Sequence, residues 1–135
     1  MQLRYDPHAS LEFQFSVEPH TPERKAAIDA IRNWSDDEQL AKFASERHGY
    51  MNSNSHFGIT YPTDLDDVDR ANGGNIPAGY VQAIAGYGDP HAETHLIPEL
   101  EYVELLRQYL VIKNMPAMAD EITELKTLLT QKFGE

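Results

Sequence analysis

Between Ser10 and Glu18 the chain alternates large apolar residues with polar ones. The apolar positions are Leu11, Phe13, Phe15 and Val17. A repeat of two residues places all four on one face of an extended chain, which indicates a half-buried β-strand. Pro19 cannot donate a hydrogen bond to a sheet and is expected to end the strand.

Two helices are predicted next from their capping residues. The Thr-Pro pair at 21–22 is typical of a helix N-terminus, and apolar residues at helical spacing extend this helix over 22–33. Ser35, with Glu three residues later, fits a capping box that begins a second helix. This helix is expected to run to about His48, with Gly49 just beyond its C-terminus.

Three more strands are expected, at residues 57–61, 79–87 and 93–97. The segment 79–87 has apolar or small residues on both faces, so we place it centrally in the sheet, with 93–97 as its hairpin partner. Residues 63–77 are rich in Asp, Asn and Gly and predict a long loop. A loop of this length in a compact domain is usually functional or disordered.

Two amphipathic helices complete the pattern. One is predicted from Pro98 to about Asn114, and the other has apolar residues at steps of three and four from Met118 to Phe133. The order is β-α-α-β-β-β-α-α. It predicts one α+β domain over residues 1–135, with a mainly antiparallel sheet of about four strands and helices packed on one face.

Composition agrees with a single globular domain. The chain has 135 residues, of which 41% are hydrophobic and 24% charged, and this length is enough for one self-sufficient core. The absence of Cys from the sequence excludes a disulfide framework and a thiolate metal site. No apolar run approaches the roughly 18–20 residues of a membrane span, and the N-terminus does not resemble a secretory signal. We therefore expect a cytoplasmic protein with no membrane partner.

The charge is strongly negative and uneven. Eleven Lys and Arg residues stand against 22 Asp and Glu residues, a formal charge of −11, which argues against a nucleic-acid partner. From Asn54 to Leu106 there are nine acids and one base, Arg70. A field of this kind attracts a basic partner and accelerates its approach, although net charge also serves solubility alone.

Two clusters of side chains suggest metal sites. His91, Glu93 and His95 would share one face of a strand and could hold a divalent ion, or they could form the polar face of an edge strand. A second cluster suggests calcium, but no register supplies the glycine that an EF-hand loop requires. The second cluster is therefore interpreted as a solvated or partner-facing acidic loop. It consists of Asp64, Asp66, Asp67 and Asp69.

Other candidates for chemistry are incomplete. Gly73 and Gly74 lack the Lys-Ser/Thr of a phosphate-binding loop. Ser53, Ser55 and His56 lie close in sequence, which does not define a nucleophile and its base. We therefore expect neither catalysis nor a cofactor. Tyr50 follows a glycine in a polar stretch and is predicted to be an exposed interface residue, since aromatic residues are enriched at interfaces.

The third and fourth predicted strands and the helix after them carry a resemblance to a protein family. The residues are Gly79-Tyr80-Val81, Gly86-Tyr87-Gly88, Glu93-Thr94-His95-Leu96-Ile97-Pro98-Glu99 and Tyr102-Val103-Glu104-Leu105-Leu106. Over residues 79–113, this hairpin and acidic helix resemble the small immunity proteins of bacterial polymorphic-toxin and contact-dependent growth-inhibition systems. The resemblance implies a non-catalytic protein that binds and neutralises a cognate toxin domain, commonly a nuclease.

The expected contacts follow from combining this resemblance with the charge. A basic toxin domain would meet the acidic loop and the hairpin turn, so the predicted partner-binding residues are Asp64, Asp66, Asp67, Asp69, Asp89 and Tyr50. Two alternatives remain open. One is a general interaction or regulatory domain, including a homo-oligomer, and the other is a small metal-binding protein or enzyme that uses His91, Glu93 and His95.

Overall fold

The computed structural model describes residues 1–52, 57–71, 75–85 and 93–133, with only the backbone of Arg70 and Glu93. The strands within these ranges are β1 (Gln2–Tyr5), β2 (Phe15–Glu18), β3 (Tyr50–Asn52), β4 (Phe57–Thr60), β5 (Tyr80–Ala85) and β6 (Glu93–Pro98). The α-helices are α1 (Pro22–Arg32), α2 (Asp37–Glu46), α3 (Asp67–Ala71), α4 (Glu99–Ile112) and α5 (Pro116–Phe133). Two short 3₁₀ turns, η1 (Leu11–Phe13) and η2 (Pro62–Asp64), complete the set.

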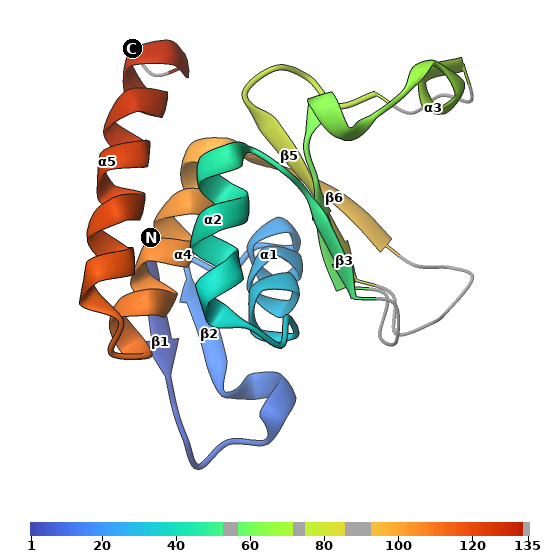
Figure 1. The fold of residues 1–135 in the computed structure, drawn as a ribbon. Helices are drawn as coiled ribbons and strands as arrows, with labels where there is room; N and C mark the ends of the chain where they lie inside the picture. Colours follow the sequence, from blue (N-terminus) through green and yellow to red (C-terminus); the bar gives the residue numbers. More distant parts are fainter. Residues whose placement is uncertain (53–56, 72–74, 86–92, 134–135) are drawn as a thin grey trace.

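The main sheet is antiparallel, with the strand order β3-β4-β5-β6. Helix α1 packs on β4, β5 and β6, and α4 also contacts β5 and β6 (Figure 1). The α+β class, the four-stranded antiparallel sheet, the helices on one face and the β5–β6 hairpin are therefore confirmed. The interior position of β5, between β4 and β6, is also as predicted.

The strand predicted over 10–18 is wrong in extent and in place. Only Phe15–Glu18 is extended, and it pairs with β1 in a separate two-stranded sheet. Leu11 and Phe13 lie in η1, 75% and 61% exposed, because the chain turns there, with the Phe13 amide donating to the Ser10 carbonyl over 2.8 Å. The fourth strand of the main sheet is instead β3, which the polar stretch after Tyr50 did not suggest.

The helix boundaries depend on caps that the sequence placed nearly correctly. Thr21 caps α1 as predicted and accepts from the Arg24 amide over 3.2 Å. The cap of α2 is Asp36 and not Ser35, since the Asp36 carboxylate accepts from the Glu38 amide over 3.0 Å. Helix α2 ends at Arg47, in the left-handed conformation with φ 53°, two residues before the predicted Gly49.

The helices beyond the sheet form an antiparallel pair, α4 and α5, which pack along each other. Asn114, with φ 59°, reverses the chain between them at the predicted position. The core is shared by α1, α4, α5 and the inner face of the sheet, where Ile28, Leu106 and Ile122 are fully buried.

Residues 63–77 were predicted as one long loop, and the described part corrects this. It contains the end of η2 and the five-residue helix α3. Asp66 and Asp69 cap each other across the start of α3: the Asp66 amide donates to the Asp69 carboxylate over 3.1 Å, and the Asp69 amide donates to the Asp66 carboxylate over 2.8 Å. Short polar side chains that bond nearby backbone explain how an Asp-rich segment becomes ordered.

Candidate functional site

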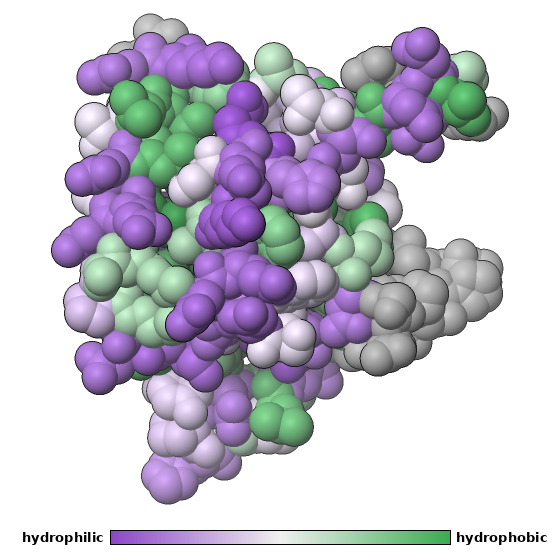
Figure 2. Space-filling view, in the orientation of Figure 1, coloured by the Kyte–Doolittle hydropathy of each residue, from purple (hydrophilic) through white to green (hydrophobic). Residues whose placement is uncertain are grey.

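The described acids of the 62–71 segment project from the end of the sheet, and we call this segment the acidic arm. In Figure 1, α3 stands away from the helical layer, beyond the end of β4. Asp66, Asp67 and Asp69 are exposed on it, and Val68 between them is 66% exposed. In Figure 2 the arm stands out from the body and the surface beneath it is recessed. The arm therefore exposes carboxylates and one apolar side chain at its surface.

Asp64 lies at the root of the arm, and its carboxylate is engaged within the chain. One oxygen accepts from the Gly49 amide over 3.0 Å and from the Tyr61 amide over 2.7 Å. The other lies 3.3 Å from Nδ1 of His48. Since its side chain is 21% exposed, Asp64 fixes the arm to the start of β3 and still presents a carboxylate edge to solution.

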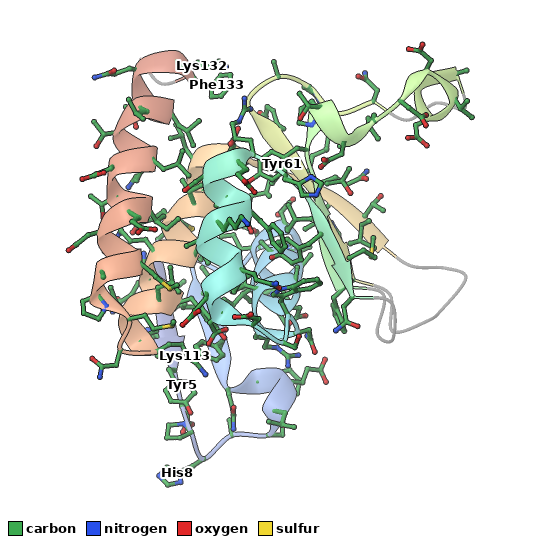
Figure 3. All side chains as sticks on the ribbon, in the orientation of Figure 1. Tyr5, His8, Tyr61, Lys113, Lys132 and Phe133 are labelled. Carbon is green, nitrogen blue, oxygen red and sulfur yellow. The ribbon has the colours of Figure 1, made fainter. Side chains whose placement is uncertain are left out.

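An ion pair supports the same end of the molecule from inside. Arg47 donates to both carboxylate oxygens of Glu99, over 2.9 and 2.8 Å, and Glu99 is fully buried. The guanidinium lies 6.0 Å from the centre of the Tyr61 ring and 5.5 Å from that of Phe133. Figure 3 shows Tyr61 and Phe133 at the same end of the molecule, opposite Tyr5 and His8. This pair connects α2, α4, α5 and the residue that precedes the arm.

Three tyrosines lie buried beside this ion pair. The hydroxyls of Tyr50 and Tyr102 are 3.2 Å apart, and burial raises the pKa of both above the usual range. Burial also raises the pKa of Tyr61, whose hydroxyl has no hydrogen-bond partner among the described residues. These phenols stay neutral at physiological pH and act as core residues.

Tyr50 was predicted to be exposed, and this is wrong. It is 7% exposed because its ring packs against Trp34, at a centroid distance of 5.0 Å, and against Phe43, at 5.7 Å. The helix that ends at Arg47 returns the chain directly into β3, and the inward position in that strand falls on Tyr50. Only an edge of Tyr50 reaches the surface, in a shallow hollow of about 330 Å³ that Met51, Thr60 and Asp64 also line.

Most of the described Lys and Arg side chains form ion pairs with carboxylates of the same chain. Eight of the ten Lys and Arg residues whose side chains are described lie within 4.0 Å of a carboxylate: Arg4, Arg24, Lys25, Arg32, Arg47, Arg107, Lys113 and Lys126. They share six acids, namely Glu18, Asp29, Asp37, Glu99, Glu101 and Glu104. The formal charge of the whole chain is −11, and Asp66, Asp67 and Asp69 are exposed. The external field is therefore negative.

The remaining predicted site residues fall partly outside the described residues. Asp89, His91, Ser53, Ser55, His56, Gly73 and Gly74 lie there, as does the side chain of Glu93. His95 pairs with Ala83 across the β5–β6 ladder. Among the residues whose side chains are described, no group of three or more His, Asp or Glu is arranged to hold a metal ion.

Comparisons with protein-family models, with curated proteins and with solved structures found no match. None of the described helices is long and apolar enough to cross a membrane.

The sequence located the acids of the arm but did not indicate the buried ion pair beside Tyr61. The Arg47–Glu99 pair joins residues 52 positions apart, and neither residue lies in a local pattern that marks it as buried. Glu99 has the sequence position of an ordinary acid in the first turn of a helix. The one available signal was the Ile-Pro-Glu run at 97–99, which fixes where the chain leaves β6.

Proposed function

We propose that this chain is a non-catalytic immunity protein that binds and neutralises a basic toxin domain. The observation that carries the proposal is the distribution of charge. The described cations lie mostly in internal ion pairs, whereas the carboxylates of the acidic arm are exposed. Such a surface favours a basic protein and steers its approach. The resemblance of residues 79–113 to immunity proteins agrees with this reading.

The proposed mechanism is occlusion, with no chemical step carried out by this chain. A nuclease toxin carries Lys and Arg residues that contact phosphates. The carboxylates of the arm would take the place of those phosphates, and the body of the domain would block entry of the substrate. Since the mutual caps of Asp66 and Asp69 hold α3 in shape, the arm is already formed before it binds. Preorganisation reduces the entropy lost on binding.

The test uses the toxin domain encoded by the gene immediately upstream. We expect the two proteins to co-purify, and we expect the triple variant Asp66→Asn/Asp67→Asn/Asp69→Asn to associate about tenfold more slowly at low salt. Asparagine can still accept the capping hydrogen bonds, so α3 keeps its shape. The matched control removes three charges from the outer face of α5: Asp120→Asn/Glu121→Gln/Glu124→Gln. Equal association rates for both triple variants would contradict a role for the arm.

A further inference from the structure

The main sheet has one face that is turned away from α1. The pairing registers align outward positions in rows across the sheet, and alternate positions face the core. One outward row crosses all four strands, a second crosses β4, β5 and β6, and a third crosses β5 and β6. We call these nine residues the open sheet face: Met51, Gly58, Ile84 and Thr94; Thr60, Gln82 and Leu96; Tyr80 and Pro98.

The open sheet face combines exposed apolar side chains with an absence of charged residues. Met51, Tyr80 and Leu96 are 46%, 39% and 39% exposed, whereas Val81, Ala83 and Ile97 on the opposite face are buried in the core. None of the nine residues is charged, although 24% of the chain is charged and the net charge is −11. Apolar residues in a face that lacks charge are typical of the centre of a protein interface.

Carboxylates flank the open sheet face on two sides. At the β3 side, Met51 and Thr60 share a hollow of about 330 Å³ with Asp64, at the root of the acidic arm. At the β6 side, Tyr80 and Leu96 line a second hollow, of about 260 Å³, with Glu23, Arg24 and Glu101. Glu101 also pairs with Arg24 over 2.8 Å, which fixes the position of its side chain. The result is an apolar centre with an acidic margin.

We infer that the open sheet face is the surface on which the basic toxin domain docks. The acidic arm contacts that domain at one margin of the face. This inference rests on the proposed function and adds the location of the contact. The partner must present an apolar patch flanked by Lys and Arg residues. The apolar centre sets how slowly the complex dissociates, and the acidic margin sets how fast it forms.

The size of the face requires a partner that also reaches the arm. The four strands have 3, 4, 6 and 6 residues. With a rise of about 3.3 Å per residue and a strand spacing of about 4.8 Å, they give a plan area of roughly 300 Å². A stable interface buries about 800 Å² on each partner. The sheet face alone is too small, so a stable complex must extend over the neighbouring margin. A second copy of this chain would bring two acidic arms and two charges of −11 together, which disfavours a homodimer on this face.

The inference is tested with variants that place a charge on the face. We expect Leu96→Lys to dissociate from the upstream toxin domain about tenfold faster than the wild type. Leu128→Lys on α5 is the matched control, since Leu128 is 64% exposed and lies away from the sheet, and it should dissociate at the wild-type rate. Circular dichroism and urea unfolding of the free proteins verify that both variants fold.

A second measurement needs no substitution. Peroxide oxidises exposed methionine to the sulfoxide. In the complex, oxidation of Met51 on the open sheet face should slow about tenfold or more, whereas Met1, 38% exposed, should oxidise at the rate of the free protein.

The outcomes separate the inference from the function on which it rests. If the wild type does not bind the toxin domain, the proposed function fails and the inference with it. If the wild type binds, but Leu96→Lys matches Leu128→Lys and Met51 stays reactive, the docking surface is wrong and the proposed function stands. A wild-type dimer that Leu96→Lys dissociates would assign the face to a second copy and overturn the inference.

Discussion

Arg47 joins the end of α2 to the start of α4 through its ion pair with Glu99. It is a non-glycine residue in the left-handed region, and this conformation directs its side chain from the end of α2 to Glu99. A fully buried carboxylate needs a partner that is both charged and well placed. Arg47 meets that need with two hydrogen bonds and also lies near the rings of Tyr61 and Phe133.

Removing Arg47 should therefore destabilise the fold strongly. We expect Arg47→Met to lower the free energy of unfolding by about 3–5 kcal/mol, because Glu99 would be left as an unpaired buried charge. The double variant Arg47→Met/Glu99→Met should recover part of that loss. Urea unfolding followed by circular dichroism measures both.

The control for this prediction is the exposed pair of Arg4 and Glu18, whose side chains are 56% and 61% accessible. Arg4→Met should lower the free energy of unfolding by less than about 1 kcal/mol, since an exposed ion pair contributes little to stability. Similar losses for Arg47→Met and Arg4→Met would show that the buried pair does not support the fold.

For single residues, the sequence indicated which residue types were candidates for contacts but not whether each side chain is buried or exposed. Asp64 and Tyr50 were both predicted as partner contacts, but the Asp64 carboxylate accepts two backbone amides and Tyr50 is buried beneath Trp34. Local polarity does not reveal which side chain a later segment of the chain will cover. Asp66, Asp67 and Asp69 are exposed, as expected for a solvated acidic segment.

At the scale of elements, strong local signals were sufficient. The Thr21 cap located α1, alternation located β4, and regular apolar spacing located α5. Apolar or small residues on both faces located β5. Short elements were missed, because β1, β3 and α3 contain three to five residues and owe their order to pairing or to mutual caps. The alternation at Leu11 and Phe13 was misleading because a turn of the β1–β2 hairpin has the same apolar spacing as a strand.

The contact between α4 and α5 gives a prediction that depends on pH. Glu104 on α4 accepts from Arg107, Gln108 and, across the helix pair, Lys126 over 3.0 Å. The hydrogen bond from Arg107 is the largest cause that lowers its pKa from 4.5 to about 2. The folded-state pKa lies below the unfolded value, so the stabilisation is present above about pH 4.5 and is lost as the pH falls toward 2.

We therefore expect Glu104→Gln to be less stable than the wild type by about 1 kcal/mol at pH 7, a value reduced for partial solvent access. This difference should shrink as the pH is lowered from 4.5 toward 2. Urea unfolding at pH 7 and pH 2.5 measures it, with Glu121→Gln on the exposed face of α5 as the control. An equal difference in the free energy of unfolding between wild type and variant at both pH values would mean that ionised Glu104 does not connect the two helices.

At the scale of the whole molecule, two features combine that sequence reasoning could only partly foresee. The acidic excess was evident from composition, whereas the structure shows that eight described cations pair with carboxylates of the same chain and that Asp66, Asp67 and Asp69 are exposed. The open sheet face could not be predicted, because it depends on the registers of four strands, one of which was not expected. Together they describe a protein with an uncharged sheet face and acidic residues beside it.

Neutralisation by binding is measured in cells that express the upstream toxin domain, with and without this protein. We predict that the toxin domain alone arrests growth, that co-expression restores it, and that a 1:1 complex can be purified from the rescued cells. Continued arrest in the presence of folded protein, or rescue without a complex, would contradict neutralisation by binding.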